Sequence, residues 1–178
     1  MPIPDDALQT LRGTSRTFFE PISRLPIGLQ EAVAAAYLSM RAIDEIEDHP
    51  ILTNAEKASL LRQVSLSLQA GPREVPWALA VRPNELPEVT RRLGEWLDLA
   101  PQAIAPRIVD AIAAMAERMA HWAEISWRVR SEADLDRYTY GVAGAVGLLL
   151  SDLWAWFAGI QTDRLRAVGF GRGLQAVN

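Results

Sequence analysis

Apolar residues recur at helical spacing along nearly the whole 178-residue chain, and no segment shows the sustained alternation of a β-strand. We therefore predict an all-α fold in a single domain over residues 1–178, without internal repeats. The segment 71–87, rich in proline, is the expected loop. The expected helices cover residues 15–24, 26–48, 55–69, 88–100 and 104–130, then a stretch from Ser131 or Asp134 to about Gly159, and a last helix from about Thr162 to the end of the chain.

Composition excludes several functional classes. Hydrophobic residues make up 49% of the chain and charged residues 22%, which is ordinary for a globular protein with a real core. The net charge of -4 gives no general attraction to nucleic acid, and the absence of cysteine excludes disulfides and thiolate chemistry. The two histidines, His49 and His121, lie too far apart in sequence to indicate an imidazole metal site. The acidic, proline-containing N-terminus lacks the pattern of a signal peptide, so we expect a cytoplasmic location.

Four acidic residues fall within five positions at the end of the longest apolar helix: Asp44, Glu45, Glu47 and Asp48. Helical spacing places Asp44, Glu47 and Asp48 on one face, with Arg41 one turn earlier. Like charges at this spacing repel by ~1 kcal/mol in water and by more in a partly dry site. Such a face is tolerable at a solvated helix end, or around a cation such as Mg²⁺, which prefers carboxylate and phosphate oxygens. The sequence leaves both interpretations open.

The segment Gly141–Ile160 is nearly continuously apolar and is long enough to cross a membrane. Asp152 near its middle argues against a membrane span, because a charge there costs ~2.5–3.5 kcal/mol on insertion scales. We therefore predict no transmembrane segment but a fully buried central helix, in which Asp152 finds a hydrogen-bond partner or faces a cavity. Glycines at every third position, Gly141, Gly144 and Gly147, allow another helix or a slender ligand to approach the backbone.

Four segments together resemble the squalene/phytoene synthase family: Thr14–Phe18, Tyr37–Asp48, Tyr138–Gly147 and Gly173–Asn178, in that order. The D-x-x-E-D spacing of the acidic motif and the G-V-A-G-x-V-G run are more similar to the squalene synthase branch. The resemblance implies an all-α isoprenoid synthase fold around a central apolar cavity. It also implies a Mg²⁺-dependent prenyltransferase that condenses two farnesyl-type diphosphates head to head through a cyclopropyl intermediate.

The resemblance assigns roles to individual residues. Asp44, Glu47 and Asp48 match the motif that holds the metal, while Arg41 and Tyr138 match catalytic positions. Tyr138 would stabilise positive charge or move a proton near the reacting centre. The positions implied to contact the substrate are Ser15, Arg16, Phe18, Tyr37, Arg41, Val142, Gly147, Gln175 and Asn178.

The sequence departs from the family pattern at its end. In the family a second acidic motif follows the segment that matches Gln175 and Asn178, and further helices follow that motif. We therefore expect little synthase activity from this chain alone. Three explanations stay open: the chain is a fragment of a longer enzyme, it is one of two chains that form the enzyme, or it is a non-catalytic protein that binds isoprenoid or a partner. No motif decides whether NADPH is used. Isoprenoid diphosphate is the expected substrate, and peripheral membrane contact is compatible with a cytoplasmic location.

Overall fold

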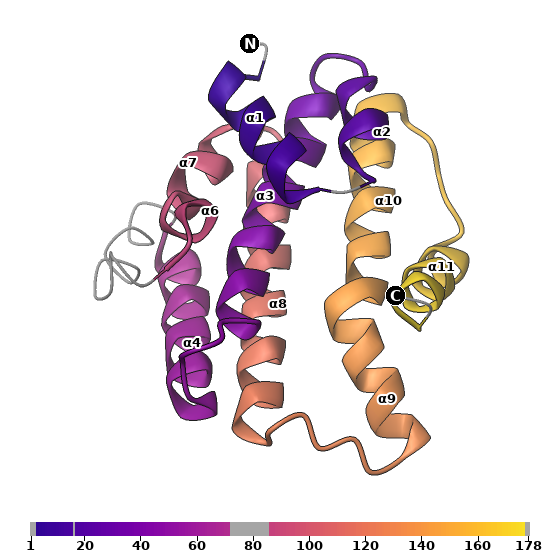
Figure 1. Ribbon diagram of the computed structural model, residues 1–178. Helices are drawn as coiled ribbons and strands as arrows, with labels where there is room; N and C mark the ends of the chain where they lie inside the picture. The colour runs from indigo at the N-terminus through magenta and orange to yellow at the C-terminus, as the bar shows by residue number, and fades with distance from the viewer. Residues whose placement is uncertain (1–2, 16, 72–85, 177–178) are drawn as a thin grey trace.

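The computed structural model describes residues 3–15, 17–71 and 86–176, and within these ranges every regular element is helical (Figure 1). The all-α prediction is therefore confirmed. The predicted loop at 71–87 lies almost entirely outside the described residues. The elements are α1 (Asp5–Thr14), α2 (Phe19–Ser23), α3 (Leu29–Glu47), α4 (Asn54–Ala70), α6 (Glu88–Arg91), α7 (Leu93–Asp98), α8 (Ala105–Glu124), α9 (Glu132–Thr139), the π-helical turn η2 (Tyr140–Gly144), α10 (Ala145–Ala158) and α11 (Arg164–Ala176).

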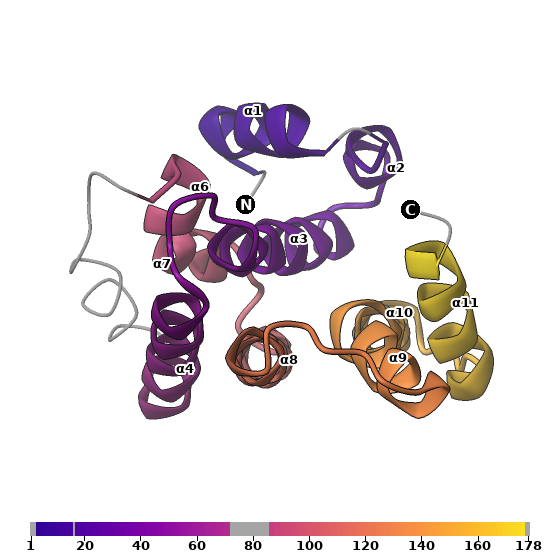
Figure 2. The same cartoon turned by 60° about the horizontal axis from the view of Figure 1, so that its bottom comes forward.

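Helix α3 lies at the centre of the fold and contacts helices on several sides, including α6, α7, α8 and α10 (Figure 2). Its first half is rich in alanine, and Ala34 and Ala35 are fully buried, so neighbouring helices approach closely. The helix begins after Gly28, whose backbone N–H donates to the Glu31 carboxylate in a capping arrangement. Because Gly28 has a φ of 93°, glycine is the residue that fits this start without strain.

Helices α4 and α8 pack against each other along their lengths and form one wall beside α3. Thr53 caps α4, with its side chain accepting from the backbone N–H of Glu56. Between the helices, the buried Ser65 hydroxyl donates to the Ala113 carbonyl at 2.9 Å. Helix α8 carries an apolar stripe at helical spacing, and all five of its residues are buried: Ile108, Ile112, Met115, Met119 and Trp122.

Several predicted helix boundaries were wrong. Helix α1 was missed, although Pro4 and two acids in its first turn are start signals, and Ser15 ends that helix instead of beginning one. The predicted helix 15–24 exists only as α2. The predicted helix 88–100 is split into α6 and α7. Near this break the Trp96 indole N–H donates to the Val89 carbonyl, which a continuous helix would use internally.

Helix α8 ends at Glu124, six residues before the predicted boundary. The N–H of Trp127 donates to the Trp122 carbonyl and the N–H of Ser126 to the Ala123 carbonyl, which is the Schellman pattern. Ser126 and Trp127 have φ values of 55° and 50°. The left-handed position of this motif usually carries glycine. Because Ser126 stands there instead, the sequence did not indicate that the helix ends.

Helices α9, η2 and α10 follow one another as a helical stretch from Glu132 to Ala158. It is the one helix among the described residues that is long and apolar enough to cross a membrane by length and composition. The prediction that the segment is fully buried was wrong, since only 28% of its most apolar part is buried. The reason is that α3, α8 and α11 cover part of its surface, while Leu150 and Phe157 stay exposed. The predicted partner of Asp152 is confirmed: Arg107 Nε donates to its carboxylate at 2.7 Å, and Arg164 pairs with the other oxygen.

Helix α11 packs against η2 and α10 where both partners carry glycine. A Cβ atom on Gly147 would overlap the carbonyl oxygen of Ala167, and one on Gly171 would overlap that of Ala143. The backbones therefore touch directly, as in close helix crossings built on small residues. Of the two predicted uses of these glycines, the structure shows the approach of another helix.

Candidate functional site

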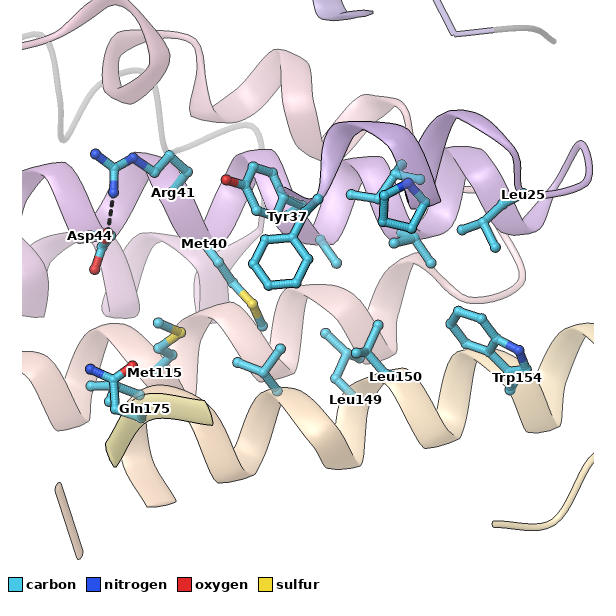
Figure 3. A pocket seen from close by; sticks show the side chains of 17 residues that line it. Leu25, Tyr37, Met40, Arg41, Asp44, Met115, Leu149, Leu150, Trp154 and Gln175 are labelled. Carbon is cyan, nitrogen blue, oxygen red and sulfur yellow. Dashed lines mark hydrogen bonds and ion pairs between the residues drawn. The ribbon is translucent and has the colours of Figure 1, made fainter. Parts of the chain in front are cut away.

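A cavity of about 470 Å³ lies between α2, α3, α8, α10 and α11. One end is polar, with Arg41, Asp44 and Gln175, and the other end is lined by Leu25 and Trp154 (Figure 3). The wall between the two ends is almost wholly apolar. Its other lining residues are Phe18, Pro21, Ile22, Val33, Ala36, Tyr37, Met40, Met115, Val142, Val146, Leu149 and Leu150.

At the polar end, Arg41 pairs with two acids on its own helix. Its Nη1 donates to Asp44 Oδ2 at 2.6 Å, and its Nη2 pairs with Glu45. The pairing fixes the guanidinium beside the cavity, and both Arg41 and Asp44 line the cavity wall. Arg41 Nε is buried and has no hydrogen-bond partner in the described part of the chain. The arginine therefore keeps an unused donor at the mouth of an apolar cavity.

The carboxylates of the acidic motif influence one another electrostatically. Burial, followed by the charge of Asp48, raises the pKa of Asp44 to about 6. Burial raises the pKa of Glu47 to about 7, with further contributions from Asp44 and Asp48. Asp48 itself ends α3 and is exposed. The three carboxyl groups thus form one acidic group at the end of α3, with two members poised near neutral pH.

This acidic group offers only oxygen donors, which suits a hard divalent cation. Over residues 3–15, 17–71 and 86–176, no three His, Cys, Asp or Glu side chains are placed to hold a metal ion by themselves. Mg²⁺ does not require such a cage, because it usually takes one or two carboxylates and completes its shell with water and substrate phosphates. Carboxylates of the acidic group fit that requirement, and the assignment of Asp44, Glu47 and Asp48 as metal ligands stays a prediction.

Glu47 is held by residues distant in sequence. Trp127 Nε1 donates to Glu47 Oε1 at 2.6 Å, and Lys57 Nζ donates to the Glu47 carbonyl, also at 2.6 Å. Trp127 was not among the predicted site residues, and its contact with Glu47 was missed. No local signal could have revealed it, because it depends on how the turn after α8 folds back onto α3.

Tyr138 faces the acidic group from α9 but does not line the cavity. Burial, followed by the charges of Glu47, Asp44 and Asp48, raises its pKa to about 12. Its ring meets Trp122 edge-on, with the ring centroids 5.4 Å apart. The phenol is therefore neutral at pH 7, close enough to the acidic group to feel its charge.

The remaining predicted site residues fall into four groups. Phe18, Tyr37, Val142 and Gln175 line the cavity together with Arg41. Ser15 is buried and donates its hydroxyl to the Leu11 carbonyl at 2.7 Å, while the Tyr37 hydroxyl nearby donates to the Thr14 carbonyl at 3.1 Å. Gly147 is packed against α11 and is not part of the cavity lining. Arg16 and Asn178 lie outside the described residues.

The raised pKa values predict how the stability of the metal-free protein depends on pH. A carboxyl whose pKa rises on folding stabilises the fold below its unfolded pKa of about 4, and this contribution is lost as pH rises through the folded pKa. For Asp44 and Glu47 the loss falls between about pH 4 and 7, from the unfolded pKa to the folded one. Carboxyls whose pKa is lowered in the folded protein, such as Asp134 and Asp152, change the stability only below about pH 4.

We therefore expect the free energy of unfolding, measured by urea titration in EDTA, to be lower at pH 8 than at pH 5. The variant Glu47→Gln should reduce this difference, because it removes the group with the higher pKa. A wild-type stability that rises steadily from pH 5 to pH 8 would contradict the expectation.

Comparison with known proteins agrees with this geometry. The sequence model of the squalene/phytoene synthase family matches residues 11–178. The chain belongs to the squalene/phytoene synthase family. The squalene synthase of Schizosaccharomyces pombe is 31% identical over 160 residues, covering 83% of this chain, and the human squalene synthase is 30% identical over 170 residues, covering 89%. The similarity to the squalene synthase branch is thereby confirmed.

The chain is shorter than these family members. It spans 33% of the length of the Schizosaccharomyces pombe enzyme and 39% of the human one. A solved structure of TcSQS with a ligand superposes with a TM-score of 0.68 at 23% identity, covering 96% of this chain and 52% of that one. This match confirms the predicted isoprenoid synthase type of fold.

Proposed function

We propose that the protein is a Mg²⁺-dependent prenyltransferase that condenses two farnesyl-type diphosphates head to head. Membership of the family supports prenyl transfer in general. The observation that carries the proposal is a single cavity with Arg41 and Asp44 at one end and an apolar wall reaching Trp154 at the other. That distribution matches an amphiphile with an anionic head and a long hydrocarbon chain, which is the shape of an isoprenoid diphosphate.

The polar end is suited to bind the head group. The Arg41 guanidinium can present paired donors to phosphate oxygens, and its Nε is still unpartnered. Asp44, Glu47 and Asp48 would hold Mg²⁺, which when bound supplies positive charge to the leaving diphosphate. Glu47 belongs to the same acidic group and is fixed by Trp127.

The walls of the cavity are suited to a reaction that develops positive charge on carbon. Phe18 and Tyr37 lie with their ring centroids 6.0 Å apart and both line the cavity, so aromatic faces are available to a carbocation. The apolar side chains beyond them exclude water, which would otherwise quench such a cation. Tyr138, held neutral beside the acidic group, would stabilise the departing anion through its O–H or move a proton.

The proposed location is cytoplasmic with peripheral membrane contact. A farnesyl-derived product is apolar and partitions into lipid. Large apolar side chains are exposed on α11, notably Leu165, Phe170 and Leu174. A second chain that supplies a second acidic motif stays one of the predicted alternatives, and nothing in the sequence decides whether NADPH takes part.

Binding of a non-reactive analogue, farnesyl S-thiolodiphosphate, tests the proposal by isothermal titration calorimetry. We expect binding in Mg²⁺ to be at least about tenfold tighter than in EDTA, a difference of about 1.4 kcal/mol. Farnesol, which lacks the head group, and inorganic diphosphate, which lacks the chain, should each bind more weakly than the analogue. Equal affinity for the analogue in Mg²⁺ and in EDTA would contradict the proposal.

A further inference from the structure

We propose that Trp127 is a positioning residue that holds the Glu47 carboxylate in the acidic group at the end of α3. The inference rests on the proposed function, in which this acidic group binds Mg²⁺. It adds a residue that lies 80 positions further along the chain and outside every motif that the sequence displays. Trp127 acts through Glu47 and does not touch the substrate cavity.

The contact itself is short and sheltered. Trp127 Nε1 lies 2.6 Å from Glu47 Oε1, and the glutamate is only 6% exposed. An N–H bond to a carboxylate is stronger than one between neutral groups, and the indole has no other donor to offer. Because only one carboxylate oxygen is engaged by Trp127, the second oxygen is left for a cation.

The backbone at Trp127 adopts a conformation that L-residues rarely take. Ser126 and Trp127 are both in the left-handed region, with φ values of 55° and 50°. The Asn54 side-chain amide donates to the Ser126 hydroxyl at 3.0 Å and fastens this turn to the start of α4. Strained positions of this kind persist only where the surrounding contacts determine them. Here those contacts direct the indole toward Glu47.

Lys57 on α4 completes the arrangement from the other side. Its Nζ donates to the Glu47 backbone carbonyl at 2.6 Å and lies 5.4 Å from the centroid of the Trp127 ring. One lysine therefore contacts both members of the Trp127–Glu47 pair. The glutamate is fixed through its side chain by α8's terminal turn and through its backbone by α4.

The variant Trp127→Phe isolates the hydrogen bond from the packing. Phenylalanine keeps an aromatic ring for Lys57 but has no N–H for Glu47. Partners that orient ligating side chains typically contribute 10–100-fold to metal affinity. We expect Trp127→Phe to weaken Mg²⁺ binding about tenfold in a titration of the protein with Mg²⁺ alone. Trp156→Phe is the matched control, because Trp156 contacts Phe157 on α10 instead of a carboxylate, and its Mg²⁺ affinity should equal that of the wild type.

A double-mutant cycle separates positioning from a general structural effect. If Trp127 acts through Glu47, adding Trp127→Phe to Glu47→Gln should cause little further loss of Mg²⁺ affinity. Additive losses in the double variant would overturn the inference. So would a Trp127→Phe protein that binds Mg²⁺ as tightly as the wild type while Glu47→Gln binds it more weakly. A wild type that does not bind Mg²⁺ would overturn the proposed metal site, and with it this inference.

The indole N–H signals in a ¹H–¹⁵N spectrum give a readout that does not depend on the folding of Trp127→Phe. The chain has six tryptophans, and one indole signal should move when Glu47→Gln is introduced and also when Mg²⁺ is added to the wild type. Indole signals that are unchanged in both experiments would contradict the proposed contact.

Discussion

The double variant Asp44→Asn, Asp48→Asn is expected to lose the Mg²⁺-dependent part of farnesyl S-thiolodiphosphate binding completely. Asparagine keeps the size of each side chain but removes the charge that attracts the cation, and a neutral amide is a much weaker Mg²⁺ ligand. The apolar wall of the cavity remains, so weak Mg²⁺-independent binding of the hydrocarbon chain should persist. Calorimetry in Mg²⁺ and in EDTA measures both parts, and the two curves should coincide for the variant.

A matched control distinguishes the site from the overall charge of the protein. The pair Asp98→Asn, Asp110→Asn removes the same two charges from exposed positions outside the cavity. Its Mg²⁺-dependent binding should equal that of the wild type. The assignment of the two carboxylates is wrong if the control pair loses Mg²⁺-dependent binding as fully as the Asp44, Asp48 variant does. It is also wrong if the Asp44, Asp48 variant keeps its Mg²⁺-dependent binding.

Replacing Gly147 by alanine is expected to have the largest effect on stability. The added Cβ would overlap the carbonyl oxygen of Ala167, a backbone atom that cannot rotate away, so α11 must shift from α10. Overpacking of this kind typically costs about 1–3 kcal/mol. Because α11 carries Gln175 to the polar end of the cavity, analogue affinity should fall as well. Urea unfolding followed by circular dichroism measures the stability change.

Gly169 on the same α11 supplies the matched control. A Cβ atom there meets nothing within 4 Å, so alanine removes backbone freedom without a clash. Gly169→Ala should therefore stabilise the protein by up to about 1 kcal/mol, through helix propensity alone. Equal stabilities of Gly147→Ala and Gly169→Ala would show that the close crossing of α10 and α11 does not exist in solution.

Local sequence patterns predicted those parts of the fold that depend on one helix at a time. The α8 stripe is visible because a 3.6-residue period directly reports which face is buried. Likewise, Arg41 and Asp44 are one turn apart, so helical geometry alone places them on one face of α3. The predicted end of α3 at Asp48 agrees with the structure to within one residue.

Features created by packing between distant segments could not be predicted in this way. The contact from Trp127 to Glu47 requires a left-handed turn at Ser126, where the sequence carries none of the usual glycine. The partial exposure of α10 depends on how many helices surround it, and its continuous apolar composition does not reveal that number. Gly147 indicated that something approaches the backbone closely at this position. That the neighbour is helix α11 became clear only from the three-dimensional arrangement.

The most direct test is a crystal structure of the protein with farnesyl S-thiolodiphosphate and Mg²⁺. We expect the diphosphate beside Arg41, with Mg²⁺ held by the acidic group that includes Asp44. We also expect the hydrocarbon chain to pass Leu149 toward Trp154. An analogue bound outside this cavity, or bound with its diphosphate at the Trp154 end, would contradict the proposed function.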